Sequence, residues 1–214
     1  MRKKITLFIF LVFGVVVYAQ QGDYRSIITV SGFAPLRDYR WNIGYMHRLN
    51  ERWWLGTEVA YGQKGMTPYP IEENDYTIFE VKPEVYYSLA PESKLKHFIS
   101  AEFSYLNHQS KKVNEEYSDE TGSYYHFQSA DYQRTRQALS INYSILLHRE
   151  SSWFGFMPKV GIGIAHRNIR YRNVQGKEYG VEPINVFGFL NDRDREQEGF
   201  RPHFNVDIKF IFKF

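Results

Sequence analysis

The sequence predicts an all-β protein, an antiparallel up-and-down transmembrane β-barrel of about eight strands. Three observations lead to this prediction. Polar and apolar residues alternate with a period of two through most of the chain, as in strands whose two faces meet different surroundings. The segments between these stretches are short and long in turn. Aromatic residues make up 18% of the 214 residues, and amphipathic rings are typical of membrane interfaces.

Residues 1–19 have the features of a secretory signal peptide. Arg2, Lys3 and Lys4 give a positive start, and residues 5–17 form an apolar run that is short for a membrane-spanning helix. Small residues precede an expected cut after Ala19, so the barrel domain is expected to cover residues 20–214. No later stretch of about 18 apolar residues exists, which excludes helical membrane spans from the rest of the chain.

Charge and cysteine content exclude other classes of protein. The chain has 27 Lys and Arg against 24 Asp and Glu, and the three basic residues of the leader account for the whole excess. The exported part is therefore neutral and gives no indication of nucleic-acid binding. The chain has no cysteine, so neither a lipid-anchored lipoprotein nor a disulfide-stapled domain is expected.

Eight strands are expected, at 24–33, 38–48, 53–64, 76–89, 97–111, 131–148, 153–172 and 200–214. The connections 49–52, 90–96 and 149–152 are short, whereas 65–75, 112–130 and 173–199 are long and polar. An even strand number with short turns at one end is typical of outer-membrane barrels, whose short turns lie in the periplasm. Pro83 and Pro158 each remove a ladder hydrogen bond, so a bulge or strand end is expected near each.

The two faces of the strands indicate which side is inward. A soluble lipocalin-type barrel has the same strand number but an apolar interior. Here the polar face carries many charges of both signs, which a narrow barrel can hold as a paired network in its lumen. That network is expected to contain Glu58, Lys64, Glu80, Lys82, Glu84, Glu102, Lys159, Asp207 and Lys209. The lipid-facing set of the last strand is Phe204, Val206, Ile208, Phe210, Phe212 and Phe214.

Aromatic residues near the strand ends are expected to form two interfacial girdles. The girdle at the short-turn end would contain Trp53, Trp54, Tyr87, Phe98, Trp153 and Phe214. The girdle at the other end would contain Trp41, Tyr61, Phe79, Tyr105 and Tyr171.

The run from Phe204 to Phe214 resembles the C-terminal strand signal of bacterial outer-membrane barrels. Together with the leader and the loop pattern, it makes the chain resemble the small OmpA/OmpX-like barrels and the generic outer-membrane β-barrel domain family over nearly its full length. The resemblance implies an outer-membrane location, contact with outer-membrane lipid and lipopolysaccharide, and insertion by the barrel-assembly machinery. It implies no specific activity.

The expected function is that of a non-enzymatic anchor whose outer loops bind an extracellular protein or glycan. Loop 112–130 suits such contact because acidic residues are followed by aromatic ones, at Tyr124, Tyr125 and Phe127. A narrow solute or ion pore and an accessory barrel of a secretion or assembly complex stay open as alternatives.

A lipid A-modifying hydrolase is the enzymatic alternative. His108 and Ser110 have the His-x-Ser spacing of outer-membrane lipid A deacylases, and Glu115 or Glu116 could supply a carboxylate. His126 with Ser129 is a looser pair. The alternation of side chains along its strand places His108 on the lumen side, whereas a lipid substrate would lie outside the barrel. No enzyme is therefore expected.

No metal or other cofactor is expected either. The seven histidines show no zinc-binding spacing, and the acidic run 191–198 lacks the glycine of a calcium loop.

Overall fold

The structure is a computed structural model that describes residues 25–37, 39–66, 73–93, 95–119, 121, 123–148, 152–180 and 196–214. The expected leader and most of the acidic run 191–198 lie outside these residues. The elements are β1 (Ser26–Ser31), α2 (Ala34–Arg37), β2 (Trp41–Arg48), β3 (Trp53–Gln63), β4 (Asn74–Ser88), β5 (Lys96–Ser118), β6 (Tyr124–His148), β7 (Phe154–Gln175), β8 (Glu178–Tyr179) and β9 (Gln197–Lys213).

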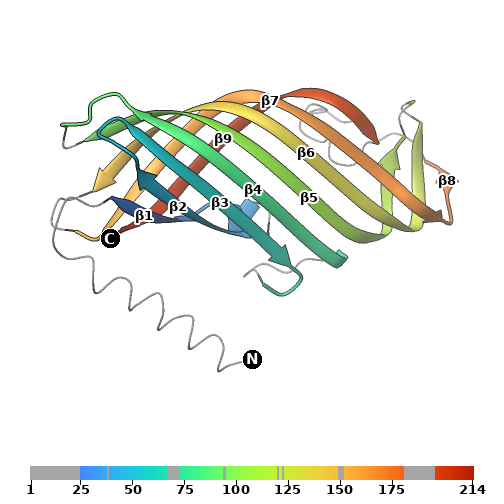
Figure 1. Ribbon diagram of the computed structural model, residues 1–214. Coiled ribbons are helices and arrows are strands. Elements are labelled where there is room, and N and C mark those ends of the chain that lie inside the picture. Colours follow the sequence, from blue (N-terminus) through green and yellow to red (C-terminus); the bar gives the residue numbers. More distant parts are fainter. Residues whose placement is uncertain are drawn as a thin grey trace.

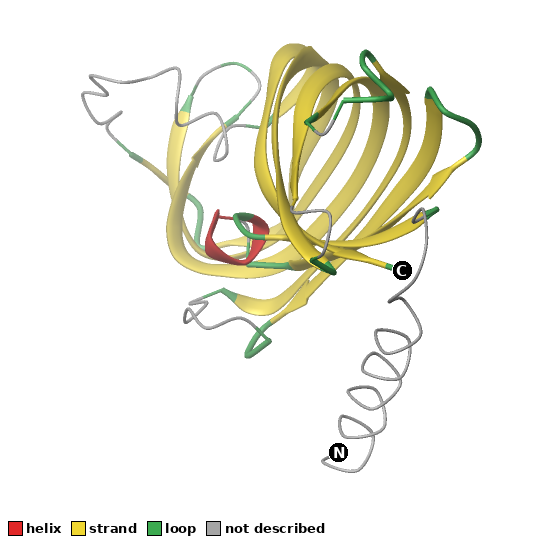
Figure 2. Cartoon of the chain, turned by 90° about the vertical axis from the view of Figure 1, so that its left-hand side faces the viewer, coloured by secondary structure: helices red, strands yellow, loops and turns green. Residues whose placement is uncertain are grey.

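Eight of these strands close into an antiparallel barrel (Figure 1). Each strand pairs with its neighbours in the chain, β9 pairs with β1 and β7, and the two-residue β8 adds only to the outer end of β6. Figure 2 shows the strands surrounding one interior. The predicted fold, an all-β barrel of about eight strands, is confirmed.

The register fixes the stagger of the barrel. Paired residues lead from Ile27 around the wall to His203, by way of Met46, Gly56, Glu84, Glu102, Ser140 and Gly163. The β1–β9 register, extended past its last pair of Ser31 with Lys209, would set His203 opposite position 37, ten residues further along the chain than Ile27. Strands in closed barrels tilt by about 40°, and an eight-stranded barrel has an interior that side chains can fill.

The expected bulge or strand end near Pro83 and near Pro158 is not found. Pro83 and Pro158 cause neither a bulge nor a strand end. Two residue pairs are missing from β4–β5 at Pro83 and from β6–β7 at Pro158, but the register is the same on both sides of each gap. A proline therefore interrupts hydrogen bonding to one neighbour here without shifting the ladder.

The long loop expected at 112–130 is mostly a hairpin. β5 continues to Ser118 and β6 begins at Tyr124, in one register throughout. At the turn, the Asp119 carboxylate accepts hydrogen bonds from the backbone amides of Thr121 and Ser123. β5, β6 and β7 therefore extend beyond β1–β4 at the long-loop end of the barrel (Figure 1), and we call this extension the outer sheet.

The faces of the strands differ as the alternation predicted. Large apolar side chains point outward and are exposed on every long strand, for example Leu55, Phe79, Phe103, Ile141 and Ile162. All six residues of the β9 set lie on this outward face, where Phe204 to Phe210 are exposed and Phe212 and Phe214 are half-buried.

An apolar plug closes the interior at the short-turn end. Each of its side chains is 2% exposed or less: Ile27, Met46, Trp54, Tyr86, Phe98, Leu146, Met157 and Ile211. Trp54 and Phe98 were expected in the short-turn girdle, which is wrong, because their parity turns them inward, where their rings meet edge to face at 5.8 Å. Gly56 makes room for this plug, since a Cβ there would lie 3.0 Å from the Tyr86 ring and 3.1 Å from Met46.

Candidate functional site

The middle of the lumen holds a network of buried ion pairs. Lys159 Nζ lies 2.7 Å from Glu84 Oε2 and 2.5 Å from Glu102 Oε2, and all three side chains are 1% exposed. Glu84 also accepts hydrogen bonds from the Tyr86 hydroxyl at 2.6 Å and the Ser100 hydroxyl at 2.5 Å. Buried charges are tolerated only when paired and hydrogen-bonded in this way.

Two further groups of charges complete the network. Glu58 pairs with Lys82 at 2.9 Å and with Lys209. Nearer the long-loop end, Glu80 pairs with Arg40 at 2.8 Å and with Arg136 at 2.6 Å. The sequence analysis missed both arginines. Arg136 has the parity of inward-facing Ala138 and Ser140, and Arg40, within the expected strand 38–48, has that of inward-facing Asn42, so alternation could have found both, although β2 begins only at Trp41.

The structure brings together eight of the nine residues expected in the lumen. Asp207 lies inside but accepts a hydrogen bond from the Ser31 hydroxyl at 2.7 Å, and no ion pair of Asp207 occurs among the described residues. Lys64 is the exception. β3 ends at Gln63, so Lys64 lies in the following turn, exposed, with its ammonium 3.0 Å from Asn74 Oδ1. Its assignment to the lumen was wrong because the strand was expected to include residue 64.

His108 and Ser110 are buried near the long-loop end of the lumen but do not form a nucleophile and base pair. Glu73 Oε2 lies 3.6 Å from His108 Nε2. Burial disfavours the Glu73 carboxylate, but the nearby polar and positive groups of His108, Ser110 and Lys112 outweigh it and lower its pKa to about 2. His108 Nε2 and Ser110 Oγ are both buried without a hydrogen-bond partner among the described residues, whereas a catalytic triad needs the imidazole hydrogen-bonded to the hydroxyl. Glu73 was missed because it was expected in a loop.

The carboxylates expected near His108 bind elsewhere. Glu115 accepts a hydrogen bond from Lys112 at 2.7 Å, and Glu116 pairs with His126 at 2.8 Å. The looser candidate is not assembled either, because the Ser129 hydroxyl lies 3.3 Å from Gln175 Oε1.

The outer sheet carries an aromatic cluster of Tyr117, Tyr125, Phe127, Ala130, Tyr132, Ile169 and Tyr171. Tyr117 stacks on Tyr171 at 4.6 Å, and Lys177 Nζ lies 3.6 Å above the Tyr125 ring. Tyr125 and Phe127 were expected as exposed contact residues, and Tyr171 in a girdle. All three are buried. On β8, Tyr179 is 83% exposed and its ring lies 4.9 Å from that of Tyr125.

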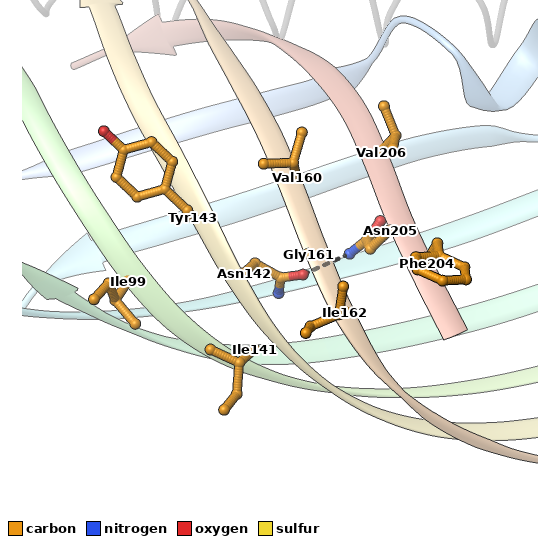
Figure 3. Close-up of a pocket in the computed structure, with 10 residues that line it drawn as sticks. All are labelled: Ile99, Ile141, Asn142, Tyr143, Val160, Gly161, Ile162, Phe204, Asn205 and Val206. Carbon is orange, nitrogen blue, oxygen red and sulfur yellow. Dashed lines mark hydrogen bonds between the residues drawn. The ribbon is translucent and has the colours of Figure 1, made fainter. Parts of the chain in front are cut away.

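The outward face has a shallow apolar hollow of about 520 Å³ across β5, β6, β7 and β9 (Figure 3). Outward Ile141, Ile162, Phe204 and Val206 border it. The Asn205 amide donates to Asn142 Oδ1 at 3.1 Å beside it (Figure 3).

Among the described residues, no three His, Asp or Glu side chains are grouped so that they could hold a metal ion. No helix in the described part of the chain is long and apolar enough to cross a membrane. Comparison with models of known families finds no match, and comparisons with curated proteins and with solved structures find none either.

Proposed function

We propose that this protein is an integral outer-membrane β-barrel that holds the outer sheet above the membrane surface, where it contacts an extracellular protein or glycan. The observation that carries the proposal is the reversal of faces: large apolar side chains surround the barrel, while its charges are paired inside. A continuous apolar surface of this size is unfavourable in water and suits the hydrocarbon of a bilayer. The pairing of β9 with β1 closes the sheet into a barrel, the form in which β-strands cross a membrane.

The length of the apolar band supports this environment. On β6 the outward apolar run extends from Leu139 to Leu147, which is nine residues, the length of a transmembrane strand. Towards the outer sheet it gives way to Gln137, Thr135 and Gln133. β6 begins at Tyr124, so the sheet continues well beyond the apolar band, into surroundings that favour polar side chains.

Two alternatives have less support. A pore would need a path past the apolar plug, whose eight side chains are each 2% exposed or less. A hydrolase would need a hydroxyl hydrogen-bonded to the imidazole, but the Ser110 hydroxyl and His108 Nε2 have no hydrogen-bond partner among the described residues. No described residue favours an accessory role in a secretion complex.

Membrane fractionation and heat-modifiable migration test the location. We expect the protein in the outer-membrane fraction, with unboiled and boiled samples migrating differently because the closed barrel survives detergent. Recovery as a water-soluble monomer would refute the proposal.

A hairpin deletion tests the role of the outer sheet. Val113 pairs with Ser129, so residues 114–128 can be replaced by Asn-Gly, a two-residue hairpin turn. The shortened protein should keep its heat-modifiable barrel but lose the binding that the full barrel shows on arrays of glycans and extracellular proteins. Thr121→Ala, confined to the turn, is the control that should keep binding. Unchanged binding by the shortened barrel would refute the assigned role.

A further inference from the structure

The base of the outer sheet contains a second hollow, of about 460 Å³, on the outward face of β5, β6 and β7. Most of the residues that line it are polar: Lys111, Ser129, Asp131, Asn173 and Gln175. We call it the polar hollow, because it offers groups that donate and accept hydrogen bonds, unlike the apolar hollow of Figure 3.

A β-bulge in β7 forms one side of the polar hollow. Ser129 of β6 pairs with Gln175. The next pair, two residues along β6, joins Asp131 to Arg172, so β7 has one extra residue between the two pairs. Asn173 in this bulge has a positive φ of 52°, which asparagine tolerates better than most residues. In a regular strand Asn173 and Gln175 would point away from the face of Arg172, whereas here all three are exposed.

The charges beside the polar hollow do not neutralise one another. Lys111, Asp131 and Arg172 are neighbours in a row across the three strands. The Asp131 carboxylate accepts a hydrogen bond from the side-chain amide of Asn173 at 2.6 Å. Neither Lys111 nor Arg172 forms an ion pair with any described residue. Two cations that are available to a ligand therefore flank one carboxylate, and the row favours an anion.

The height of the polar hollow limits what can reach it. Asp131 lies eight residues beyond Leu139, where the outward apolar run of β6 ends. At a rise of about 3.3 Å per residue and a tilt of about 40°, the hollow lies about 20 Å above the hydrocarbon. Lipid head groups extend only about 5–8 Å beyond the hydrocarbon. A lipid phosphate therefore does not reach the hollow, whereas the sugar residues of a polysaccharide do.

We propose that the polar hollow binds a uronic acid residue of an extracellular polysaccharide. The carboxylate of the sugar lies against Lys111 and Arg172. Its ring hydroxyls donate to Asp131 and exchange hydrogen bonds with the side-chain amides of Asn173 and Gln175. A protein partner would insert an aromatic or arginine anchor into a desolvated pocket, and this open hollow provides none.

The inference rests on the proposed function and names the class of glycan that the outer sheet binds. The hairpin 114–128 braces the polar hollow from above. A Cβ on Gly176 would lie 2.6 Å from the Gln128 side chain, so β7 packs closely against this hairpin directly after Gln175. Replacement of residues 114–128 by Asn-Gly should therefore weaken this site as well.

Binding of acidic tetrasaccharides to the folded barrel tests the ligand class. Heat-modifiable migration is checked first, since its absence would refute the proposed function and not the site. Calorimetry in uncharged detergent then compares tetragalacturonate and tetramannuronate with their methyl esters, which keep the hydroxyls, and with tetraglutamate, which keeps the charges. The better acid should bind at least about tenfold more tightly than its ester and than tetraglutamate. A heat-modifiable barrel that shows no such preference would overturn the proposal.

A repeat in vesicles that contain lipopolysaccharide identifies the source of the sugar. The free tetrasaccharide should still bind, because the polar hollow lies above the head groups. Loss of its binding in these vesicles would mean that sugars of the membrane itself fill the hollow, and would overturn the assignment to a free polysaccharide.

Two variants and a control place the ligand. Lys111→Gln should weaken binding of the acid at least about fivefold and leave that of the ester unchanged. Asn173→Gly permits the positive φ but removes the amide, so it should weaken acid and ester alike. Arg170→Gln is the matched control, because Arg170 is exposed on β7 but pairs with Glu198 and does not line the hollow. Equal losses from Lys111→Gln and Arg170→Gln would indicate general charge attraction and overturn the site.

Discussion

Replacement of Lys159 by Met tests whether the lumen network holds the barrel together. The ammonium lies 2.7 Å from Glu84 and 2.5 Å from Glu102, with all three side chains 1% exposed. Without it, Glu84 keeps Lys209 at 3.5 Å, whereas Glu102 keeps a hydrogen bond from Asn205 at 3.1 Å. Removing one partner of a buried ion pair costs about 3–5 kcal/mol, because the other charge stays buried and unpaired. We expect Lys159→Met to lower the free energy of unfolding by about that amount.

A second variant shows that the loss is electrostatic. Glu102→Gln in the Lys159→Met background removes the unpaired charge and keeps the contact with Asn205, so it should recover about 1–2 kcal/mol. Urea unfolding in uncharged detergent, followed by tryptophan fluorescence and heat-modifiable migration, measures both changes. Lys64→Met is the control, since Lys64 is exposed and its loss should cost under about 0.5 kcal/mol. A double variant less stable than Lys159→Met would refute the reasoning.

Three more substitutions test other parts of the barrel. The folded pKa of Glu73 is about 2 and its ordinary value is 4.5, so the interactions of its carboxylate with His108, Ser110 and Lys112 stabilise the barrel above pH 4.5 and are lost as the pH falls towards 2. Glu73→Gln should therefore remove about 2 kcal/mol of acid sensitivity, allowing for partial exposure, and identical pH profiles of the two proteins would contradict this. Trp54→Ala should cost about 3–5 kcal/mol in urea unfolding, and a cost below about 1 kcal/mol would mean that the plug is loosely packed. Gly56→Ala should cost about 1–3 kcal/mol, because the new methyl group meets Tyr86 and Met46, and a more stable variant would contradict that packing.

Much of the candidate site could be read from alternation, and the exceptions have physical reasons. Parity assigns each strand residue to a face, so the charges from Glu58 to Lys209 could be grouped before their contacts were known. The alternation along their strands also places Trp54 and Phe98 on the inward face. They were assigned to an interfacial girdle because they lie near strand ends. Glu73 was expected in a loop, where no periodicity indicates direction, whereas Arg40 lay in the expected strand 38–48 with the parity of inward-facing Asn42 and was overlooked.

Strand ends were the weaker part of the prediction. Residues 112–130 are polar enough to suggest a loop, yet most of them pair, because a hairpin above an apolar band needs no apolar outward face. Conversely, the first two strands were expected at 24–33 and 38–48, but β1 stops at Ser31 and β2 begins at Trp41. The contacts of Gly32 and Ala34 that end it involve β9 and Ser31, which composition does not reveal.

The sequence by itself determined the fold class, the approximate strand number and the two sets of residues that share a face, because side chains alternate along every strand. Only the tertiary structure decided which carboxylate meets which ammonium, that the plug closes one end of the lumen, and that β1 ends at Ser31. These features depend on the stagger with which the wall closes. That stagger is a property of all eight strands together, and no single segment encodes it.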